Sequence, residues 1–405
     1  MESQIDTHKE LIQFVSDHIH ARPEDILMKF SKKELSFDLK FAVMQIACRN
    51  KAYKKIPYYL SHPAFLFPDA ISSEQASDER VANFHASLIG TGKKVVDLTT
   101  GLGIDAMTIA RQGNNMTCVE LDPIKADALA YNSNVLNIPK LEVVCKDCVD
   151  YLKSLTIFPD LFFIDPARRD ASKNRTYALS DCLPDVTKLY RIIIESGSEL
   201  YIKASPLLDI SAIRNELEYI NAIYVVSVKN ECKEVLIHLK REISGKPLLH
   251  AVDLDDKGIK SSFSLTNEKN ETSIPIAEIQ DIVAEFYLYE PNSALMKLNA
   301  AREICRRFTD IKKISANTEL YVSPSLIADF PGRIIKIERI PTSKELKHLK
   351  GRGFSVVSRN YPAKAEEIRT KFGLKENPNN FIYAFRIGRK GKPMIIEGKR
   401  MDAHN

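Results

Sequence analysis

Residues 95–105 read Val-Val-Asp-Leu-Thr-Thr-Gly-Leu-Gly-Ile-Asp, and this stretch decides the fold. An apolar run ends in an acidic residue, Asp97, and a turn with two glycines follows, which is the pattern of a buried parallel strand leading into a helix. Two later apolar runs also end in acids, at Glu120 and at Asp165. Because the carboxyl ends of parallel strands meet at one edge of a sheet, we expect the three acids to line one site.

The segments around this stretch alternate between strand and helix patterns. We expect five buried strands, at 94–98, 116–121, 141–145, 160–164 and 199–203. Such alternation predicts an α/β domain, at residues 89–243, with a parallel sheet covered by helices on both faces. Two more strands are expected at 222–228 and 234–239; the five residues between them allow only a hairpin, so the sheet is expected to end with one antiparallel strand.

The rest of the chain has different patterns. Residues 1–88 carry apolar residues at helical spacing and predict a helical domain. Residues 244–325 predict a small α+β domain with one long helix at 274–288 and a second at 294–308. Residues 326–405 predict a further small α+β domain.

Composition bounds the class of protein. The chain has 405 residues, of which 44% are hydrophobic and 27% charged, as in soluble globular proteins. It shows no signal-peptide pattern and no run approaching the roughly 18 apolar residues of a membrane span, which predicts a cytoplasmic protein without membrane contact. The seven scattered cysteines fit a reducing compartment.

Positive charge is concentrated near the C-terminus. Residues 331–405 hold 18 Lys and Arg against 7 Asp and Glu, a net charge of +11, which leaves −6 for residues 1–330. A basic segment on an acidic body predicts binding to a polyanion, most simply a nucleic acid; the alternative is a solvated charged face. The densest basic stretch also holds two aromatics, and we expect substrate contacts in it from Lys350, Arg352 and Arg359, beside Phe354 and Tyr361.

The acid of the first strand indicates the cofactor. Residues 101–106 also fit the loose G-x-G-x-x-A pattern of dinucleotide sites. A carboxylate at Asp97 would repel a pyrophosphate, whereas it can hold the ammonium group of a methionine moiety. S-adenosylmethionine has that ammonium and no phosphates, so we expect this cofactor, with Gly101 and Gly103 letting the backbone approach it.

The other acids fit other parts of the same cofactor. Glu120 can accept hydrogen bonds from both ribose hydroxyls, Asp147 and the adjacent Cys148 are placed for adenine, and Asp165 for the sulfonium. Each acid taken singly could be a helix N-cap, but four at successive strand ends favour a cofactor site. The full set of expected cofactor contacts is Asp97, Thr99, Gly101, Gly103, Asp105, Glu120, Leu121, Asp147, Cys148 and Asp165.

Residues 93–240 resemble class I S-adenosylmethionine-dependent methyltransferases, and residues 97–105 are similar to the first motif of bacterial 16S rRNA guanine-N2 methyltransferases. Nearly the whole chain resembles the bacterial THUMP-like-domain methyltransferases. The motifs that carry this second resemblance are Glu-Gln-Ala-Ser at 74–77, Asp-Pro-Ala-Arg-Arg at 165–169, Tyr-Glu-Pro-Asn at 289–292, Phe-Pro-Gly-Arg at 330–333 and Ser-Arg-Asn-Tyr-Pro at 358–362. The resemblance implies a Rossmann-like sheet, small ferredoxin-like or THUMP-like C-terminal domains, and methylation of rRNA or tRNA.

The motif after the fourth strand bears on the target atom. Amino-group methyltransferases commonly carry Asp/Asn-Pro-Pro-aromatic there, and this chain keeps only the acid and the first proline. We expect Asp165 and Pro166 to hold the attacking group, and Arg168 and Arg169 to position the substrate; the alternative for the arginines is a surface ion pair. The departure from the motif leaves adenine N6 in doubt and favours guanine N2.

Two other chemistries are disfavoured. RNA C5-pyrimidine methyltransferases need a cysteine nucleophile after the fifth strand, and this chain has Ala204 in that place, in Lys-Ala-Ser-Pro at 203–206. Cys145 and Cys148 have a zinc-like spacing, but no second pair completes four ligands, so we expect no metal.

The sequence thus predicts an S-adenosylmethionine-dependent methyltransferase that modifies a base amino group in structured RNA by in-line transfer. Two alternatives stay open at this point. One is an RNA-binding or assembly protein that holds the cofactor without turnover, and the other is a methyltransferase of proteins or small molecules.

Overall fold

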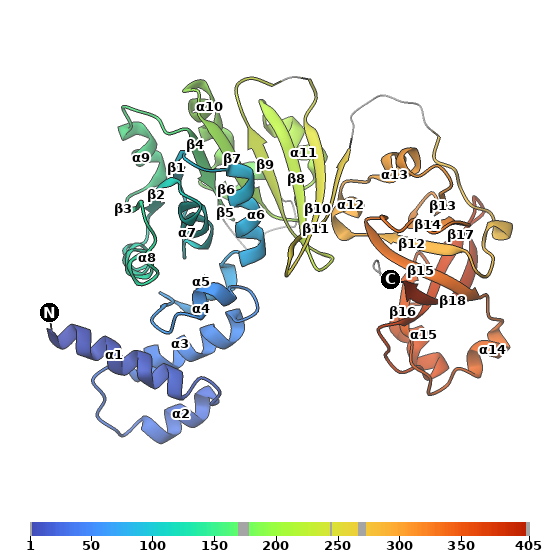
Figure 1. Ribbon diagram of the computed structural model, residues 1–405, viewed down its shortest axis with the longest axis horizontal. Coiled ribbons are helices and arrows are strands. Elements are labelled where there is room, and N and C mark those ends of the chain that lie inside the picture. The colour runs from blue at the N-terminus through green and yellow to red at the C-terminus, as the bar shows by residue number, and fades with distance from the viewer. Residues whose placement is uncertain (1, 169–177, 244, 266–272, 402–405) are drawn as a thin grey trace. The chain divides into compact units, whose positions relative to one another are not determined.

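The computed structural model describes residues 2–168, 178–243, 245–265 and 273–401, which fold into two compact units (Figure 1). Unit 1 consists of Met1–Val228, Lys233–Pro247 and Leu254–Lys260. Unit 2 consists of Lys229–Cys232, Leu248–Asp253 and Ser261–Asn405.

Unit 1 begins with helices, as expected from the sequence. They are α1 (Glu2–Asp17), α2 (Pro23–Phe30), α3 (Leu39–Ala52), α4 (Pro57–Leu60), α5 (Ala70–Gln75) and α6 (Glu79–Ile89). Asp38, Asp69 and Asp78 cap the first turns of α3, α5 and α6, since each side chain accepts a hydrogen bond from a backbone N–H there. Helices α1 to α3 enclose a small apolar cluster of their own, whereas Ala82 and Ala86 of α6 belong to the core of the following sheet.

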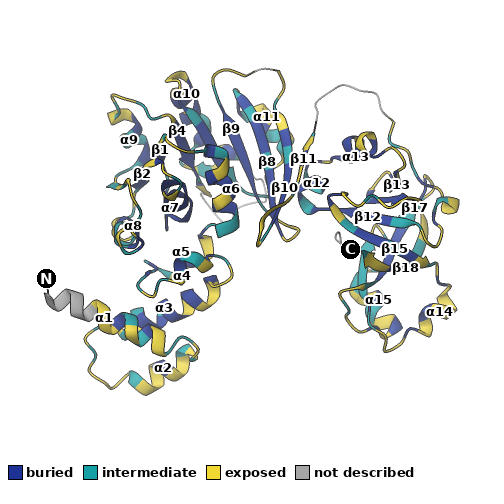
Figure 2. Cartoon of the chain, in the orientation of Figure 1, coloured by how far each residue is buried: buried dark blue, intermediate teal, exposed yellow. Residues whose placement is uncertain are grey.

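The large sheet has nine strands in the order β11-β10-β8-β9-β7-β4-β1-β2-β3. The strands are β1 (Lys94–Asp97), β2 (Asn115–Glu120), β3 (Leu141–Cys145), β4 (Leu161–Ile164), β7 (Glu199–Ala204), β8 (Ile220–Val228), β9 (Glu231–Leu239), β10 (Leu248–Asp255) and β11 (Gly258–Leu265). Pairing is parallel between β1 and both β2 and β4, between β2 and β3, and between β4 and β7. The five predicted parallel strands are confirmed, and the described residues of β1 and β4 are largely buried (Figure 2).

Helices and short elements connect these strands. The helices are α7 (Ile104–Arg111), α8 (Pro123–Val135), α9 (Cys148–Ser154), α10 (Val186–Glu195) and α11 (Ile210–Glu216). A two-stranded ribbon of β5 (Ala167–Arg168) and β6 (Cys182–Leu183), with a short 3-10 helix at Leu179–Asp181, lies between β4 and α10 in the chain.

The predicted hairpin is present, but it does not end the sheet. Lys229 and Asn230 join β8 to β9 with φ angles of 51° and 67°, the left-handed pair of a type I′ turn. Strand β9 pairs antiparallel with β7, so it lies between β7 and β8, and the strand order continues past β8. The expectation was wrong because residues 234–239 are all buried, including the polar Glu234 and His238, which is the pattern of a central strand and not of an edge strand.

Unit 2 contains a seven-stranded sheet in the order β13-β14-β12-β15-β18-β17-β16. Its strands are β12 (Tyr287–Pro291), β13 (Lys312–Ser315), β14 (Thr318–Ser323), β15 (Gly332–Arg339), β16 (Ser355–Arg359), β17 (Asn380–Ile387) and β18 (Lys392–Met401). Its helices are α12 (Ser293–Lys297), α13 (Ala301–Arg307), α14 (Ser343–Lys347) and α15 (Ala365–Phe372). Alternate residues of β17 enter two apolar clusters, Tyr383 on one face and Ile382 on the other. Strands from both sides of residue 325 therefore belong to one sheet.

The helix predicted at 274–288 is wrong. The backbone N–H of Ala277 donates to the carbonyl of Lys313 in β13, a 3-10 turn occupies Ile279–Asp281, and β12 begins at Tyr287. The apolar spacing suits either structure, and pairing of β12 with β14 and β15 decides for the strand. The helix predicted at 294–308 is two short helices, because Asn299 adopts a left-handed φ of 51° between them.

No helix within the described ranges is both long and apolar enough to span a bilayer.

Candidate active site

Parallel pairing brings the predicted acids to one edge of the sheet of unit 1. Asp97 ends β1 in register with Cys118 of β2 and Phe163 of β4, so the loops after these strands are neighbours. The backbone N–H of Asp165 donates to Oγ1 of Thr99 at 2.8 Å and ties two of these loops together. The carboxyl edge of β1, β2 and β4 therefore holds Asp97, Glu120 and Asp165, as the sequence predicted.

Two positions of the loop after β1 disfavour any residue other than glycine. Gly101 and Gly103 have φ angles of 59° and 80°. A Cβ on Gly103 would also lie 2.2 Å from Cδ1 of Leu129 on α8. Glycine at 103 thus serves both the backbone conformation and the packing of the loop against a helix.

Glu120 is oriented by two backbone donors. Its Oε2 accepts the N–H of Gly101 at 2.8 Å, and its Oε1 accepts that of Asp122 at 2.9 Å. Each carboxylate oxygen has a second lone pair, so this geometry still permits bonds from ribose hydroxyls.

Asp97 is a buried acid at the end of β1. It is 3% exposed, and its Oδ1 accepts the N–H of Thr99 at 3.0 Å. Burial raises the pKa of the Asp97 carboxyl well above its ordinary value. A cation bound against this carboxyl would offset the cost of burying its charge, and the ammonium of a methionine moiety is such a cation.

The residues predicted to contact adenine follow β2 and β3. Asp147 caps α9, since its Oδ1 accepts the N–H groups of Val149 and Asp150 at 2.9 and 3.1 Å. Cys148 is buried, which raises the pKa of its thiol to about 11 and keeps it neutral. Leu121 is 66% exposed beside Glu120 and offers an apolar surface to a base. Capping by Asp147 is thus established, while its bond to adenine stays a prediction.

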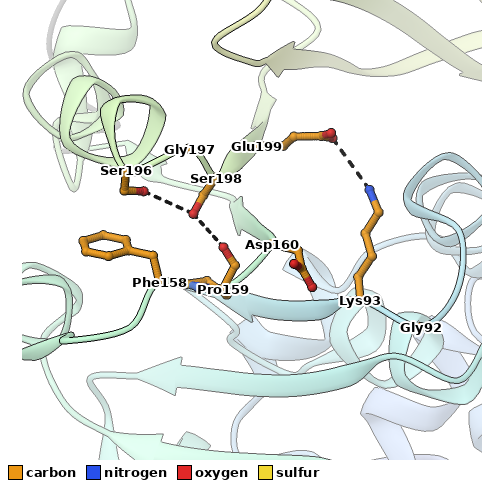
Figure 3. A pocket seen from close by; sticks show the side chains of 9 residues that line it. All are labelled: Gly92, Lys93, Phe158, Pro159, Asp160, Ser196, Gly197, Ser198 and Glu199. Carbon is orange, nitrogen blue, oxygen red and sulfur yellow. Dashed lines mark hydrogen bonds and ion pairs between the residues drawn. The ribbon is translucent and has the colours of Figure 1, made fainter.

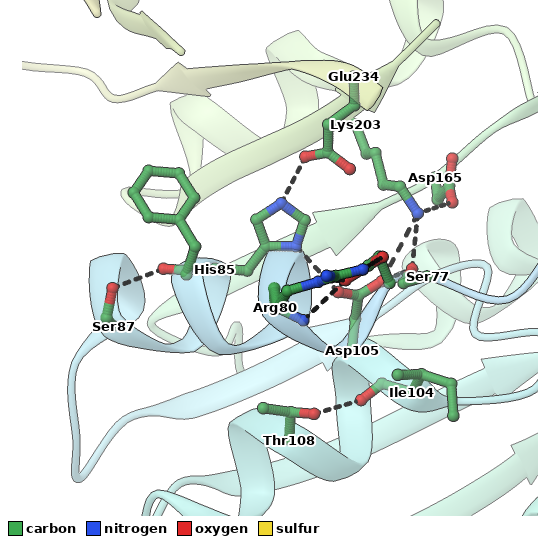
Figure 4. Close-up of polar contacts among 12 residues, drawn as sticks. Ser77, Arg80, His85, Ser87, Ile104, Asp105, Thr108, Asp165, Lys203 and Glu234 are labelled. Carbon is green, nitrogen blue, oxygen red and sulfur yellow. Dashed lines mark hydrogen bonds and ion pairs between the residues drawn. The ribbon is translucent and has the colours of Figure 1, made fainter. Parts of the chain in front are cut away.

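Lys203, at the end of β7, joins the acids at this edge. Its Nζ lies 2.7 Å from Oδ2 of Asp165, 2.7 Å from Oγ of Ser77 and 3.6 Å from Oδ2 of Asp105 (Figure 4). Burial alone would lower the pKa of Lys203, but the carboxylates of Asp165 and Asp105 raise it above its ordinary value. Lys203 is therefore a cation held among carboxylates.

His85 of α6 extends this network into the core. Its Nδ1 lies 2.9 Å from Asp105, its Nε2 lies 2.5 Å from Glu234 of β9, and Ser77 donates to Asp105 (Figure 4). Burial lowers the pKa of His85, but the two carboxylates outweigh it and raise that pKa to about 10. His85 is therefore an imidazolium. Burial would raise the pKa of Asp105, but Lys203 and His85 lower it below its ordinary value.

The charges of this network do not cancel. Three carboxylates, of Asp105, Asp165 and Glu234, face two cations, His85 and Lys203. Asp165 has the most exposed side chain of the five. The excess negative charge is thus placed at the open edge of the site, where a sulfonium or the hydrogens of an amino group would be attracted.

Lys203, His85 and Glu234 are not among the site residues that the sequence predicted. A signal for Lys203 was present in the sequence, because it directly follows the apolar strand residues 200–202. A lysine is rarely buried unless it is paired with an acid, so its position there indicates a charged partner. Asp105 was expected to touch the cofactor; in the structure it bonds to Ser77 and His85 and forms an ion pair with Lys203.

The expected substrate residues are spread over both units. Arg168 lies in β5 with only its backbone described, and Arg169 lies outside the described residues. Lys350 and Arg352 are exposed in the turn between α14 and β16, whereas Arg359 on β16 bonds to Glu290. The expected aromatic neighbour Phe354 is not a surface residue, because it packs in the core with Leu346 and Phe372.

The described part of the chain shows no group of three or more His, Cys, Asp and Glu side chains able to hold a metal.

A cavity of about 520 Å³ lies at the opposite edge of the sheet (Figure 3). The cavity is lined by Gly92, Lys93, Phe158, Pro159, Asp160, Ser196, Gly197, Ser198 and Glu199, near the amino ends of β1, β4 and β7. It includes none of the predicted site residues.

The chain is similar to a solved structure and to a family of ferredoxin-like domains. The crystal structure of a proposed methyltransferase from Porphyromonas gingivalis W83 matches with a TM-score of 0.85 and 26% identity, covering 97% of this chain and 98% of that one. The chain has a methyltransferase fold. Residues 287–331 match a family of ferredoxin-like domains, which confirms the expected α/β fold with a ferredoxin-like C-terminal part.

Two curated proteins share part of the chain. Ribosomal RNA small subunit methyltransferase J of Legionella pneumophila is 32% identical over 90 residues, which cover 20% of this chain and 37% of that protein. An uncharacterised RNA methyltransferase of Mycoplasma mobile is 25% identical over 151 residues, which cover 36% of this chain and 40% of that protein. The match therefore spans about two fifths of the length of these relatives.

Proposed function

We propose that this chain is an S-adenosylmethionine-dependent methyltransferase that modifies a base amino group in RNA, with guanine N2 as the favoured atom. The observation that carries the proposal is the row of acids Asp97, Glu120 and Asp165 at the carboxyl edge of a methyltransferase sheet, around a loop that requires Gly103. The partial relatives named as RNA methyltransferases support RNA as the substrate class, and one of them is named for ribosomal RNA.

The residues at this edge fit the cofactor by their chemistry. Asp97 would hold the ammonium of the methionine part, and Glu120 the ribose hydroxyls. Leu121, Asp147 and Cys148 would surround adenine, with Leu121 as the apolar contact. When bound, S-adenosylmethionine supplies a methyl group made electrophilic by the sulfonium.

Asp165 is the residue that would hold the attacking group. Burial raises the pKa of Asp165, and the hydrogen bond from Lys203 to one of its oxygens, at 2.7 Å, opposes that rise and fixes the plane of the carboxyl. The carboxylate can accept a hydrogen bond from an exocyclic amine and so orient the amine for in-line attack. As the new N–C bond forms and the S–C bond breaks, the nitrogen must lose a proton, and Asp165 is the acceptor at hand. Pro166 is buried next to it and restricts the backbone there.

The basic C-terminal segment supplies the proposed contacts with RNA. Lys350 and Arg352 are exposed, as phosphate contacts must be. Arg168 and Arg169, directly after the Asp165 motif, are proposed to position the target nucleotide.

Labelled methyl transfer tests the proposal. Purified protein, S-adenosylmethionine with a labelled methyl group, and total RNA from a strain lacking the gene should give labelled N2-methylguanosine in digested nucleosides. The D165N variant should give none above background. Label in protein in place of RNA would favour another substrate class, and cofactor binding without any transfer would favour an RNA-binding or assembly protein.

A further inference from the structure

Three separated stretches of the chain converge on one buried carboxylate in unit 2. Glu290 lies on β12, Arg333 is the second residue of β15 and Arg359 ends β16. These residues belong to the motifs at 289–292, 330–333 and 358–362; of the three, only Arg359 was expected from the sequence to contact the substrate.

The contacts to Glu290 are short and use both of its oxygens. Arg359 donates from Nε at 3.0 Å and from Nη2 at 2.6 Å to Oε1. Arg333 donates from Nη1 at 3.0 Å to Oε2, and the hydroxyl of Tyr383 donates to the same oxygen at 2.8 Å. The Arg333 guanidinium also lies over the ring of Phe381, 5.0 Å from its centroid. Both arginines are therefore fixed by several partners.

The cluster carries an excess positive charge. Glu290 is only 3% exposed, so its charge is neutralised by these partners and not by water. Burial and the nearby Glu290 raise the pKa of Tyr383, which keeps the phenol neutral. Two guanidinium groups thus face a single carboxylate, and one positive charge remains.

The arginines also keep donors for another partner. A guanidinium has five N–H donors, and the bonds above use Nη1 of Arg333 and Nε and Nη2 of Arg359. Among the described residues, no partner bonds Nε or Nη2 of Arg333 or Nη1 of Arg359. The side chains are 30% and 47% exposed, so these atoms belong to groups that solvent reaches.

A second arginine of the same strand shows what a simple structural pair looks like. Arg339 of β15 bonds Glu397 of β18 through Nε at 2.5 Å, one cation to one carboxylate, without excess charge. A buried glutamate in this sheet is therefore satisfied by one arginine, and the second arginine at Glu290 calls for another explanation.

We propose that Arg333 and Arg359, held by Glu290, form a binding site for a backbone phosphate of RNA. Guanidinium groups bind phosphate oxygens through paired N–H donors. Arginines already fixed by Glu290 and Tyr383 lose little further side-chain entropy when they bind. The proposal rests on RNA being the substrate class, and it places one contact with that RNA in unit 2.

The test compares RNA binding by full-length R333Q, R359Q and the matched control R339Q, using a labelled RNA hairpin over a range of salt concentrations. R333Q and R359Q should each weaken binding about 5- to 10-fold and lower the slope of log K against log salt by about 0.7–0.9, while R339Q leaves both unchanged. R359K should fall between wild type and R359Q, because it keeps the charge and loses the paired donors. S-adenosylmethionine affinity, measured on every variant, should stay constant and shows that unit 1 is intact, and an unchanged thermal unfolding midpoint of each variant shows that unit 2 is folded.

The possible failures are distinguishable. If wild type binds the hairpin and R333Q and R359Q behave like R339Q, the phosphate site is wrong and the proposed RNA methylation stands. If wild type binds no RNA, both the site and RNA as substrate fall. If inorganic phosphate alone binds tightly in calorimetry and the variants lose it without losing RNA affinity, the site serves a free phosphate and the RNA assignment is overturned.

Discussion

The ammonium nitrogen of Lys203 lies 2.7 Å from Oδ2 of Asp165, across the ends of the neighbouring strands β7 and β4. This ion pair joins the predicted catalytic acid to a chain of polar groups that runs through Asp105 and His85 to Glu234. Ser77 and His85 come from the helical segment that precedes the sheet, so that segment supplies part of the candidate site.

Replacing Lys203 should impair methyl transfer far more than cofactor binding. K203M removes the cation that opposes the rise in the pKa of Asp165, so this pKa should rise further and the acid limb of the rate profile should move to higher pH. We expect kcat to fall about 100-fold with little change in KM for the cofactor. Steady-state methylation over pH 5–9 measures this, with K203R as the partial rescue.

The control for K203M is K93M. Lys93 forms an ion pair with Glu199 at 3.7 Å at the opposite edge of the sheet, so its loss should leave the pH profile unchanged. An unchanged profile in K203M would mean that Lys203 only stabilises the fold.

Asp97 should determine recognition of the methionine part of the cofactor. D97N removes the charge but keeps the shape, and the loss of a charge-assisted hydrogen bond of about 1.5–3 kcal/mol should weaken S-adenosylmethionine binding roughly 10- to 100-fold. Calorimetry with 5′-methylthioadenosine, which lacks the amino-acid part, provides the comparison. Equal weakening of both ligands would contradict the assignment of Asp97 to the ammonium.

Alanine at Gly103 should destabilise unit 1. Its φ of 80° disfavours a side chain by about 1–2 kcal/mol, and the contact of 2.2 Å with Leu129 adds overpacking of about 1–3 kcal/mol. We therefore expect G103A to lower the free energy of unfolding by about 2–5 kcal/mol, measured by urea denaturation. G113A, at a φ of 96° with open space around it, should lose only the smaller conformational part.

The charge of His85 should make the free energy of unfolding decrease as the pH becomes alkaline. Its pKa rises from an ordinary 6.5 to about 10 in the folded state, so protonation favours folding. This contribution is complete below about pH 6.5 and is lost as the pH rises through 10. H85Q lacks it, so the difference in unfolding free energy between wild type and H85Q should be largest near pH 6 and shrink by pH 10. A constant difference across that range would contradict a charged His85.

The sequence predicted the strands of unit 1 well because buried parallel strands are continuous apolar runs with turn residues at their ends. Strands expected at 94–98 and 199–203 are found at Lys94–Asp97 and Glu199–Ala204. The segment 274–288 was misjudged because its apolar spacing fits a helix, and only the neighbouring strands β14 and β15 show that its end is a strand. The candidate acids were found for the same reason as the strands, since each follows a strand end.

By itself, the sequence determined the methyltransferase sheet, its glycine loop and the acids that end its strands, because these depend on patterns within about ten residues. The tertiary structure alone decided which charges meet. Ser77 and Lys203 are 126 positions apart, and His85 and Glu234 are 149 apart. Whether such groups touch depends on strand order and helix packing. Once they are buried together, the charge of each group shifts the pKa of its neighbours. The same holds for Arg333 and Arg359, because nothing in the sequence shows that both contact one buried glutamate in the fold.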